Sequence, residues 1–304
     1  MNIAVIGLGG CGFNSLQNLS HTFDKQTTTL ICLTTESVKP SYNENITFIQ
    51  IGANTTKGLG AGAKPEVGSQ AFIESQNVVK QAISEFDVAI VAAGLGGGTG
   101  TGGIVKLLQL LTELSIPHLV IVTLPFPFEG KKKKDIANNK IEDILELTTP
   151  IMVLENSKIL SKLDKATPLT EAFKQGDRAL TDMALAITDM IKEVGLINID
   201  IADLNLVLSQ PGYCLVGKEI YSQESGINFI LNQSLLLTNE LNLKTAKSAI
   251  IVITAPQTMS LIDYDKIGND FRNELSDSIT IISGVNYRTT NSHEIEVFFL
   301  ISGM

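Results

Sequence analysis

The feature that most constrains this chain is the glycine-rich run Gly-Leu-Gly-Gly-Gly-Thr-Gly-Thr-Gly-Gly at residues 94–103. The apolar residues 88–93 before it predict a buried strand, and residues 104–114 after it repeat apolar side chains at helical spacing. Glycine is favoured where the backbone needs a positive φ or where another group approaches closely. Free N–H groups and the positive end of the helix dipole point out of such a turn. The sequence therefore predicts a strand, an anion-binding turn and a helix.

This turn is not the common phosphate loop G-x-x-x-x-G-K-[ST], because no lysine follows its last glycine. A second glycine turn, residues 7–12, fits G-x-G-x-x-G between a strand predicted at 2–6 and a helix predicted at 13–21. With Glu36 roughly 20 residues further on, this turn alone would suggest a nicotinamide-dependent oxidoreductase. That fold has no standard use for the denser turn, and we find no catalytic acid or base beside the first one, so this alternative is disfavoured.

Predicted strands and helices alternate through the first half of the chain. The strands lie at residues 28–33, 46–51, 88–93, 118–124 and 151–154, and the helices at 65–84, 104–114 and 135–147. This order predicts an α/β fold with a parallel sheet, helices on both faces and a ligand at the carboxyl ends of the strands, where the glycine turns lie. The long loop at 52–65 is either a linker or, as we expect, a segment that folds over the ligand.

Residues 168–194 form the longest predicted helix, about 40 Å at 1.5 Å per residue, and we expect it to join two domains. Gly176 interrupts it at a cost of about 1 kcal/mol relative to alanine, so we expect something flat to lie against the helix there. One interpretation is a base stacked on Phe173, with the Asp177 carboxylate accepting hydrogen bonds from two N–H groups of guanine. The alternative is a core Phe173 and a surface Asp177.

The segment after Gly195 contains Asp200 and Asp203, whose spacing predicts a helix N-cap with a capping-box partner. Both lie near the far end of the long helix, too far from the expected base to contact the chain's own nucleotide. Further strands near 213–216, 249–254, 278–285 and 294–301 and helices near 225–238 and 259–274 predict a smaller α+β domain. We therefore expect a nucleotide-binding domain at 1–167, a central helix at 168–195 and a C-terminal domain at 196–304.

Composition disfavours several functional classes. The formal net charge of -9 argues against a nucleic-acid partner, because phosphate contacts need a basic face. The three cysteines and three scattered histidines fit no paired spacing, so we expect neither a disulfide frame nor a metal site built from these side chains. No run approaches the ~20 apolar residues of a membrane helix, and residues 1–12 lack a leader pattern. We expect a cytoplasmic protein without direct membrane insertion.

Four lysines at residues 131–134 follow the turn Pro-Phe-Pro-Phe-Glu-Gly at residues 125–130. At a helix start, each lysine opposes the helix dipole at a cost of ~0.3–1 kcal/mol. A bound polyphosphate could offset this cost. A solvated charge run explains three of the four equally well, so we expect one lysine to be a ligand.

Together, the run at 94–103, the turn at 125–130 and the segment Gly-Leu-Ile-Asn-Ile-Asp-Ile-Ala-Asp at 195–203 resemble the tubulin/FtsZ superfamily, and the resemblance covers residues 1–304. It implies the tubulin/FtsZ-like fold, in which a long central helix joins a parallel-sheet domain to a smaller α+β domain. It further implies a GTPase that binds GTP/GDP with Mg²⁺ and polymerises head to tail, with cell division as the expected role. Such contacts do not close, so they generate filaments.

The resemblance also implies which residues bind the nucleotide. Glu129 matches an acid that contacts the ribose, Asn156 a residue near the sugar and base, Phe173 the stacking ring and Asp177 the guanine-reading position. The full implied set is Gly9, Gly10, Cys11, Asn14, Gly60, Ala61, Gly62, Gly96, Gly97, Gly98, Thr99, Gly100, Thr101, Glu129, Lys133, Asn156, Phe173 and Asp177.

Asn198, Asp200 and Asp203 match the family's loop that inserts into the next subunit and completes its catalytic site. Their carboxylates would orient and polarise a water at the neighbour's GTP, with Mg²⁺ offsetting phosphate charge. The expected partners are copies of this chain, with other FtsZ-like or division proteins as further candidates.

Some positions depart from the family pattern. Residues 34–36 are Thr-Thr-Glu where Asn-Thr-Asp is frequent, Lys133 stands where an arginine commonly reaches the γ-phosphate, and Lys64 where asparagine is frequent. Lysine lacks the fork of arginine, so we expect altered phosphate geometry and turnover. The chain ends soon after its last predicted strand, so we expect no linker and terminal peptide for membrane-tethering partners. A plasmid- or phage-type segregation filament and a non-polymerising regulatory module remain as alternatives.

Overall fold

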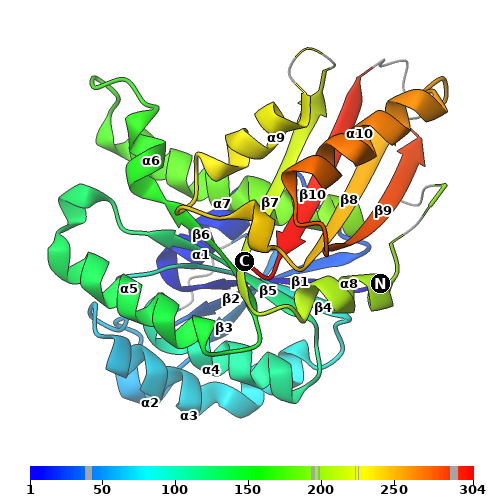
Figure 1. Cartoon of the computed structure of the whole chain (residues 1–304). Coiled ribbons are helices and arrows are strands. Elements are labelled where there is room, and N and C mark those ends of the chain that lie inside the picture. The colour runs from blue at the N-terminus through cyan, green and yellow to red at the C-terminus, as the bar shows by residue number, and fades with distance from the viewer. Residues whose placement is uncertain (38–42, 193–195, 198, 223, 225, 288–293) are drawn as a thin grey trace.

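The computed structural model describes the chain except for residues 38–42, 193–195, 198, 223, 225 and 288–293. Its centre is a ten-stranded sheet in the order β3-β2-β1-β4-β5-β6-β7-β10-β8-β9 (Figure 1). The strands are β1 (Ile3–Leu8), β2 (Thr28–Thr34), β3 (Ile46–Gln50), β4 (Val88–Gly94), β5 (His118–Leu124), β6 (Pro150–Glu155), β7 (Gly212–Tyr221), β8 (Ser248–Ala255), β9 (Thr280–Tyr287) and β10 (Ile295–Ser302). The α-helices are α1 (Gly9–Leu19), α2 (Ala53–Thr56), α3 (Pro65–Ile83), α4 (Thr99–Glu113), α5 (Lys131–Leu145), α6 (Asn156–Ser161), α7 (Leu169–Lys192), α8 (Ile201–Leu208), α9 (Gly226–Leu235) and α10 (Leu261–Glu274).

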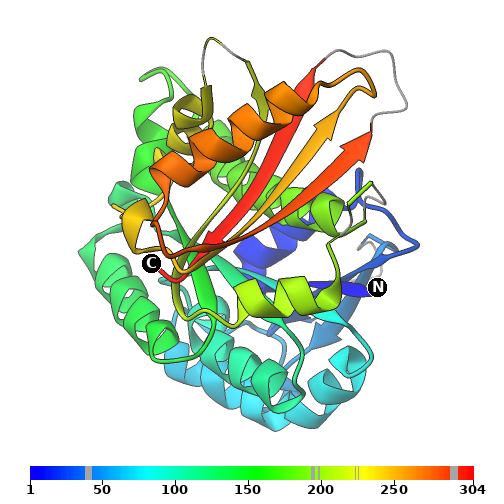
Figure 2. The same ribbon diagram turned by 45° about the vertical axis from the view of Figure 1, so that its right-hand side comes forward.

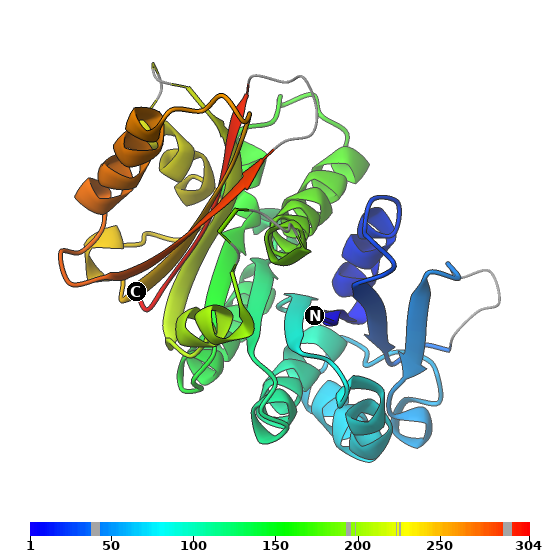
Figure 3. The same cartoon turned by 90° about the vertical axis from the view of Figure 1, so that its right-hand side faces the viewer.

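Strands β3 to β7 run parallel, which confirms the predicted α/β fold. Every residue of β1 and nearly every residue of β4 and β5 is buried, as expected for strands that helices cover on both faces. Helices α3, α4 and α5 contribute to the hydrophobic core on one face, and α1 and α7 to that on the other (Figure 3). The turns after β1, β4, β5 and β6 therefore meet at one edge of the sheet.

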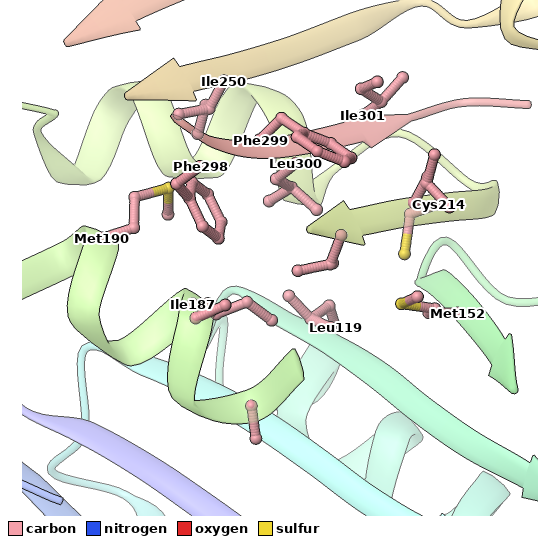
Figure 4. Close-up of a cluster of buried hydrophobic side chains, with 14 of the residues drawn as sticks. Leu119, Met152, Ile187, Met190, Cys214, Ile250, Phe298, Phe299, Leu300 and Ile301 are labelled. Atoms are coloured by element: carbon pink, nitrogen blue, oxygen red, sulfur yellow. The ribbon is translucent and has the colours of Figure 1, made fainter. Parts of the chain in front are cut away.

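Helix α7 lies between two parts of this sheet (Figure 2). Ile187 and Met190 of α7 share one buried cluster with side chains from β5, β8 and β10 (Figure 4). The two parts of the sheet join through a short strand pairing. Strands β6 and β7 share only two registered pairs, between residues 150–151 and 212–213. Strands β7 to β10 carry α9 and α10 on the side away from α7. The domain boundaries given above stay a prediction.

Several helices begin earlier than the sequence suggests. Helix α1 begins at Gly9, α4 at Thr99 and α5 at Lys131, inside segments predicted as turns or as a charge run. The low helix propensity of glycine conceals such starts, although the first turn of any helix leaves free N–H groups. The glycine turns are thus themselves helix N-termini. No helix in the described part of the chain combines the length and apolar character needed to cross a bilayer.

Candidate functional site

A cavity of about 330 Å³ opens at the carboxyl edge of β1, β4, β5 and β6, beside the N-terminal half of α7. Most of the residues predicted to bind a nucleotide line it, namely Gly9, Gly10, Cys11, Asn14, Gly97, Gly98, Thr99, Gly100, Glu129, Lys133, Asn156, Phe173 and Asp177. These residues come from five helices, α1, α4, α5, α6 and α7, and from the turns that precede α4 and α5. The fold therefore brings the sequence motifs together at one place.

The two glycine turns contact each other in this cavity. Gly9 has a φ of +72°, and a Cβ there would lie 3.2 Å from the backbone nitrogen of Gly100. Gly96 has a φ of +94°, and its N–H donates to Thr101 Oγ1 at 2.9 Å. Thr101 is fully buried, and neither it nor Gly96 lines the cavity. These two predicted ligands lie behind the wall, where their hydrogen bond fixes the shape of the turn.

Gly60, Ala61 and Gly62 lie beside the glycine turn and not on the cavity wall. A Cβ on Gly98 would lie 2.7 Å from Ala61 Cβ, so this loop packs directly against the turn. The hydroxyls of Thr99 and of Thr35, which directly follows β2, are hydrogen-bonded at 2.6 Å. Closure of the loop over a ligand stays a prediction.

Gly68 of α3 packs against the same turn, because a Cβ there would overlap the carbonyl oxygen of Gly98 and lie 3.1 Å from Thr99 Cα. We expect Gly68→Ala to lower the free energy of unfolding by about 1–3 kcal/mol and to weaken nucleotide binding, since the backbone must shift. The matched helical control is Gly268→Ala in α10, where no atom lies within 4 Å of the added Cβ. For Gly268→Ala we expect the free energy of unfolding to rise by up to about 1 kcal/mol, because alanine is the better helix former. Urea unfolding measures both, and equal effects would refute the contact argument.

Asp177 lies half-buried in the cavity wall, where two side chains of α1 donate to it. Asn14 Nδ2 donates to Oδ2 at 3.1 Å and the Cys11 thiol to Oδ1 at 3.6 Å. Burial raises the pKa of Asp177, although both hydrogen bonds act in the opposite direction. Burial, and next the charge of Asp177, raise the pKa of Cys11 to about 12, so Cys11 is a neutral thiol. The cavity thus contains one oriented carboxylate at this end.

Asn156 is buried at the start of α6, and its Oδ1 has no hydrogen-bond partner. A Cβ on Gly176 would lie 2.9 Å from that oxygen and 3.6 Å from Phe126 Cζ. The flat groups against Gly176 are therefore an amide and a ring of this chain, which corrects the expectation that a bound base explains this glycine. An unpaired buried acceptor that lines a cavity marks a place for a donor from a ligand.

Glu129 connects the turn after β5 to the start of α5. Its Oε1 accepts from the Phe126 N–H and its Oε2 from Lys133 Nζ, both at 2.9 Å. Of the four consecutive lysines, Lys133 lines the cavity, whereas the other three are exposed. Lys133 is therefore the lysine of this run that can meet a ligand, since a phosphate oxygen could replace the carboxylate as its partner. Its role as a ligand stays a prediction.

Asp200 and Asp203 form the predicted capping box. The Asp203 N–H donates to Asp200 Oδ1 at 2.9 Å, and the Asp200 N–H donates to Asp203 Oδ2 at 3.1 Å. Asp200 is exposed, and neither residue lines the cavity. The pair follows the C-terminal end of α7, roughly 20 Å along the helix axis from Asp177. The third member of the predicted catalytic set, Asn198, lies outside the described residues.

Among the lining residues that the predicted binding set left out are Thr123 and Phe126. Thr123 is near the carboxyl end of β5, so the rule that ligands bind at this sheet edge could have identified it. Phe126 belongs to the Pro-Phe-Pro-Phe-Glu-Gly turn, but nothing in that motif says which of its two rings is buried. Phe126 is 2% exposed and Phe128 is 50% exposed.

Comparisons with known proteins agree with the nucleotide site inferred from the cavity. A family model described as "Tubulin/FtsZ family, GTPase domain" matches residues 2–164. Cell division protein FtsZ of Pseudomonas aeruginosa is 32% identical over 304 residues, which cover 99% of this chain and 77% of that protein. Cell division protein FtsZ of Coxiella burnetii is 30% identical, with 99% of this chain and 78% of that protein covered.

Solved structures are similar over nearly the whole chain. An empty FtsZ dimer of M. jannaschii has a TM-score of 0.85 at 27% identity, with 99% of this chain and 88% of that chain covered. A GTPγS-bound protofilament of a CetZ protein from Haloferax volcanii has a TM-score of 0.79 at 20% identity, covers 100% of this chain and 93% of that chain, and supports the fold alone. The family match over more than half the chain, the relatives and the cavity agree, and the chain belongs to the Tubulin/FtsZ family and is a GTPase.

Proposed function

We propose that this protein hydrolyses GTP while assembled head to tail with copies of itself, and that this assembly acts in cell division. The observation that carries the proposal is the distribution of carboxylates. Among the described residues that line the cavity, only Glu129 and Asp177 are acidic, and groups of the same chain engage both. Asp200, by contrast, is exposed at the far end of α7. A neighbouring molecule can therefore supply the carboxylate that the site lacks.

In the proposed complex, each part of a guanine nucleotide meets residues that line the cavity. The N–H groups of the two glycine turns and the Lys133 ammonium face the anionic phosphates, as helix N-termini commonly do. In the proposed complex Glu129 contacts the ribose, Asp177 accepts from the Watson–Crick edge of guanine, and Asn156 Oδ1 accepts from the sugar or base. The proposal is supported by the position of all three side chains on the cavity wall and by the lack of a partner for Asn156 Oδ1. Mg²⁺ would enter with the triphosphate and offset its charge.

Catalysis in this arrangement depends on positioning and charge. In the proposed junction, Asp200 and Asp203 of one subunit orient and polarise a water against the γ-phosphate held by the next. Asn198, which lies outside the described residues, is the third group proposed for this loop. The capping box fixes both carboxylates at the start of α8, so their placement needs no rearrangement within the subunit. Hydrolysis then requires assembly.

Exposed apolar side chains at both ends of the molecule support a contact of this kind. Leu196 is 66% exposed and Ile197 44% exposed on the segment before Asp200. At the cavity end, Leu59 is 85% exposed beside Gly60. Contiguous exposed apolar side chains such as Leu196 and Ile197 are typical of interaction surfaces.

The protein's concentration tests the proposal. We expect GTP turnover per subunit to rise with protein concentration and to reach a plateau as polymer forms, because a lone subunit has half of each catalytic site. Steady-state phosphate release and sedimentation with GTP or GDP measure the two quantities together. Turnover per subunit that stays constant down to dilute monomer would exclude a shared site.

The other outcomes separate the remaining roles. Absence of polymer with GTP would favour a regulatory nucleotide-binding module, and binding to a DNA adaptor would favour a segregation filament. The free thiols of Cys11, Cys32 and Cys214 fit the reducing cytoplasm that we propose as its location.

A further inference from the structure

Three phenylalanine rings meet at the base end of the cavity. The rings of Phe126 and Phe128 stack at 5.1 Å between centroids with an interplanar angle of 9°. Phe173 meets both edge-on, at 5.0 Å from Phe126 and 5.7 Å from Phe128. Of the three, Phe126 is the buried one, whereas Phe173 is 41% exposed and lines the cavity. The exposed ring therefore rests on the buried one.

Phe126 is fixed from several directions. Its Cζ lies 3.6 Å from the position of a Cβ on Gly176, so α7 limits the ring on that side, and the stacked Phe128 limits another side. Its N–H donates to Glu129 Oε1, while the Glu129 N–H donates to its carbonyl oxygen at 2.9 Å. The residue that supports the ring of Phe173 is thus also hydrogen-bonded to the acid proposed to contact the ribose.

We propose that Phe126 is a positioning residue whose ring sets the plane of Phe173 for stacking on the base, while its backbone N–H and carbonyl oxygen hold Glu129 in register with the sugar. The inference rests on the proposed function, because it requires a base against Phe173. An exposed phenylalanine on a helix can turn about two side-chain torsions, and a ring packed edge-on against it favours one of these orientations. Phe126 then raises affinity for the nucleotide through Phe173 and not by direct contact alone.

A double-mutant cycle on GDP binding tests this role. We expect Phe173→Leu to weaken GDP binding about tenfold and Phe126→Leu about three- to tenfold, the range of aromatic pair energies. In the Phe173→Leu background, Phe126→Leu should cost less than about twofold, because the ring through which it acts is gone. Calorimetry with GDP and with ribose 5′-diphosphate gives a second readout. Affinity for the base-free ligand should stay within about twofold in all variants, because leucine at position 126 keeps the backbone groups that hold Glu129.

Each contrary result has a distinct meaning. If the losses of GDP affinity in Phe126→Leu and Phe173→Leu simply add in the double variant, the positioning role is wrong. It is also wrong if Phe126→Leu weakens ribose 5′-diphosphate binding as much as it weakens GDP binding. No effect of Phe173→Leu would instead overturn the proposed base position. Because Phe126 is buried, Phe128→Leu serves as a second variant that does not line the cavity. It should weaken GDP binding about two- to threefold only where Phe173 is present, and an effect in both backgrounds would contradict the inference.

Discussion

Replacing Asp200 by asparagine is expected to lower the GTP turnover number by about 100-fold or more while changing GTP affinity less than twofold. Removal of one preorganised electrostatic group from a hydrolytic site typically costs about this factor. The Asp200 side chain does not line the chain's own cavity, so binding should be intact. Steady-state phosphate release and equilibrium binding of GTP under the same conditions measure the two effects.

Asparagine is the informative replacement because Asp200 also caps α8. Asn and Asp are comparable N-caps, whereas Asp200→Ala would add a capping loss of about 0.5–2 kcal/mol to any catalytic effect. Ser260→Ala provides a matched control, since Ser260 caps α10 through its bond to the Asp263 N–H. It should lower stability similarly and leave turnover within about twofold. Loss of GTP affinity in Asp200→Asn would contradict the assignment to a neighbour's site.

A mixing experiment then separates a shared site from a site within one subunit. Asp200→Asn retains an intact cavity, and Asp177→Asn retains an intact Asp200. The assay uses a GTP concentration too low to fill the Asp177→Asn cavity, so that each variant alone is nearly inactive. If the two halves come from different molecules, a mixture of the two variants should then recover a measurable part of the wild-type rate at their mixed junctions. No recovery, in a mixture shown by sedimentation to co-assemble, would refute catalysis across the junction.

Asp177→Asn is expected to have opposite effects on nucleotide affinity and on stability. Guanine affinity should fall about 10- to 100-fold, because a charge-assisted acceptor for two N–H groups becomes a neutral amide. Burial raises the pKa of Asp177, so the folded state binds more protons than the unfolded state as this group titrates. Stability from this group is therefore lost as pH rises through its raised pKa, and Asp177→Asn should make the nucleotide-free protein more stable at neutral pH.

The matched control on the same helix is Asp182→Asn. Burial also raises the pKa of Asp182, but this residue does not line the nucleotide cavity. Because Asp182 is more exposed than Asp177 and lies near Arg178, it should show a smaller stability effect of the same sign and leave GDP affinity within about twofold. Thermal unfolding at acidic and neutral pH, with calorimetry of GDP binding, tests both variants. In the wild type, affinity should fall as pH drops through the raised pKa of Asp177, and a pH-independent affinity would contradict its role as an ionised acceptor.

Much of the fold followed from local patterns. The continuous apolar runs of β1, β4 and β5 identified buried parallel strands, and the three- and four-residue apolar steps of α7 identified the long helix to within a few residues at each end. These patterns succeed because burial on a sheet or along one helix face repeats with a fixed period. The starts of α1 and α4 were harder, since glycine weakens the helical signal at the places where free N–H groups are needed.

The sequence by itself determined the parallel α/β order, the glycine turns and the capping of α8 by Asp200, because each depends on residues within a few positions of one another. Only the tertiary structure decided which residues share the cavity. It placed Thr101 behind the wall, Asn156 against Gly176, and Phe126 beneath Phe173. The Asn156–Gly176 and Phe126–Phe173 contacts join residues 20 and 47 positions apart, so they depend on how close-packed elements meet, and no local period encodes them.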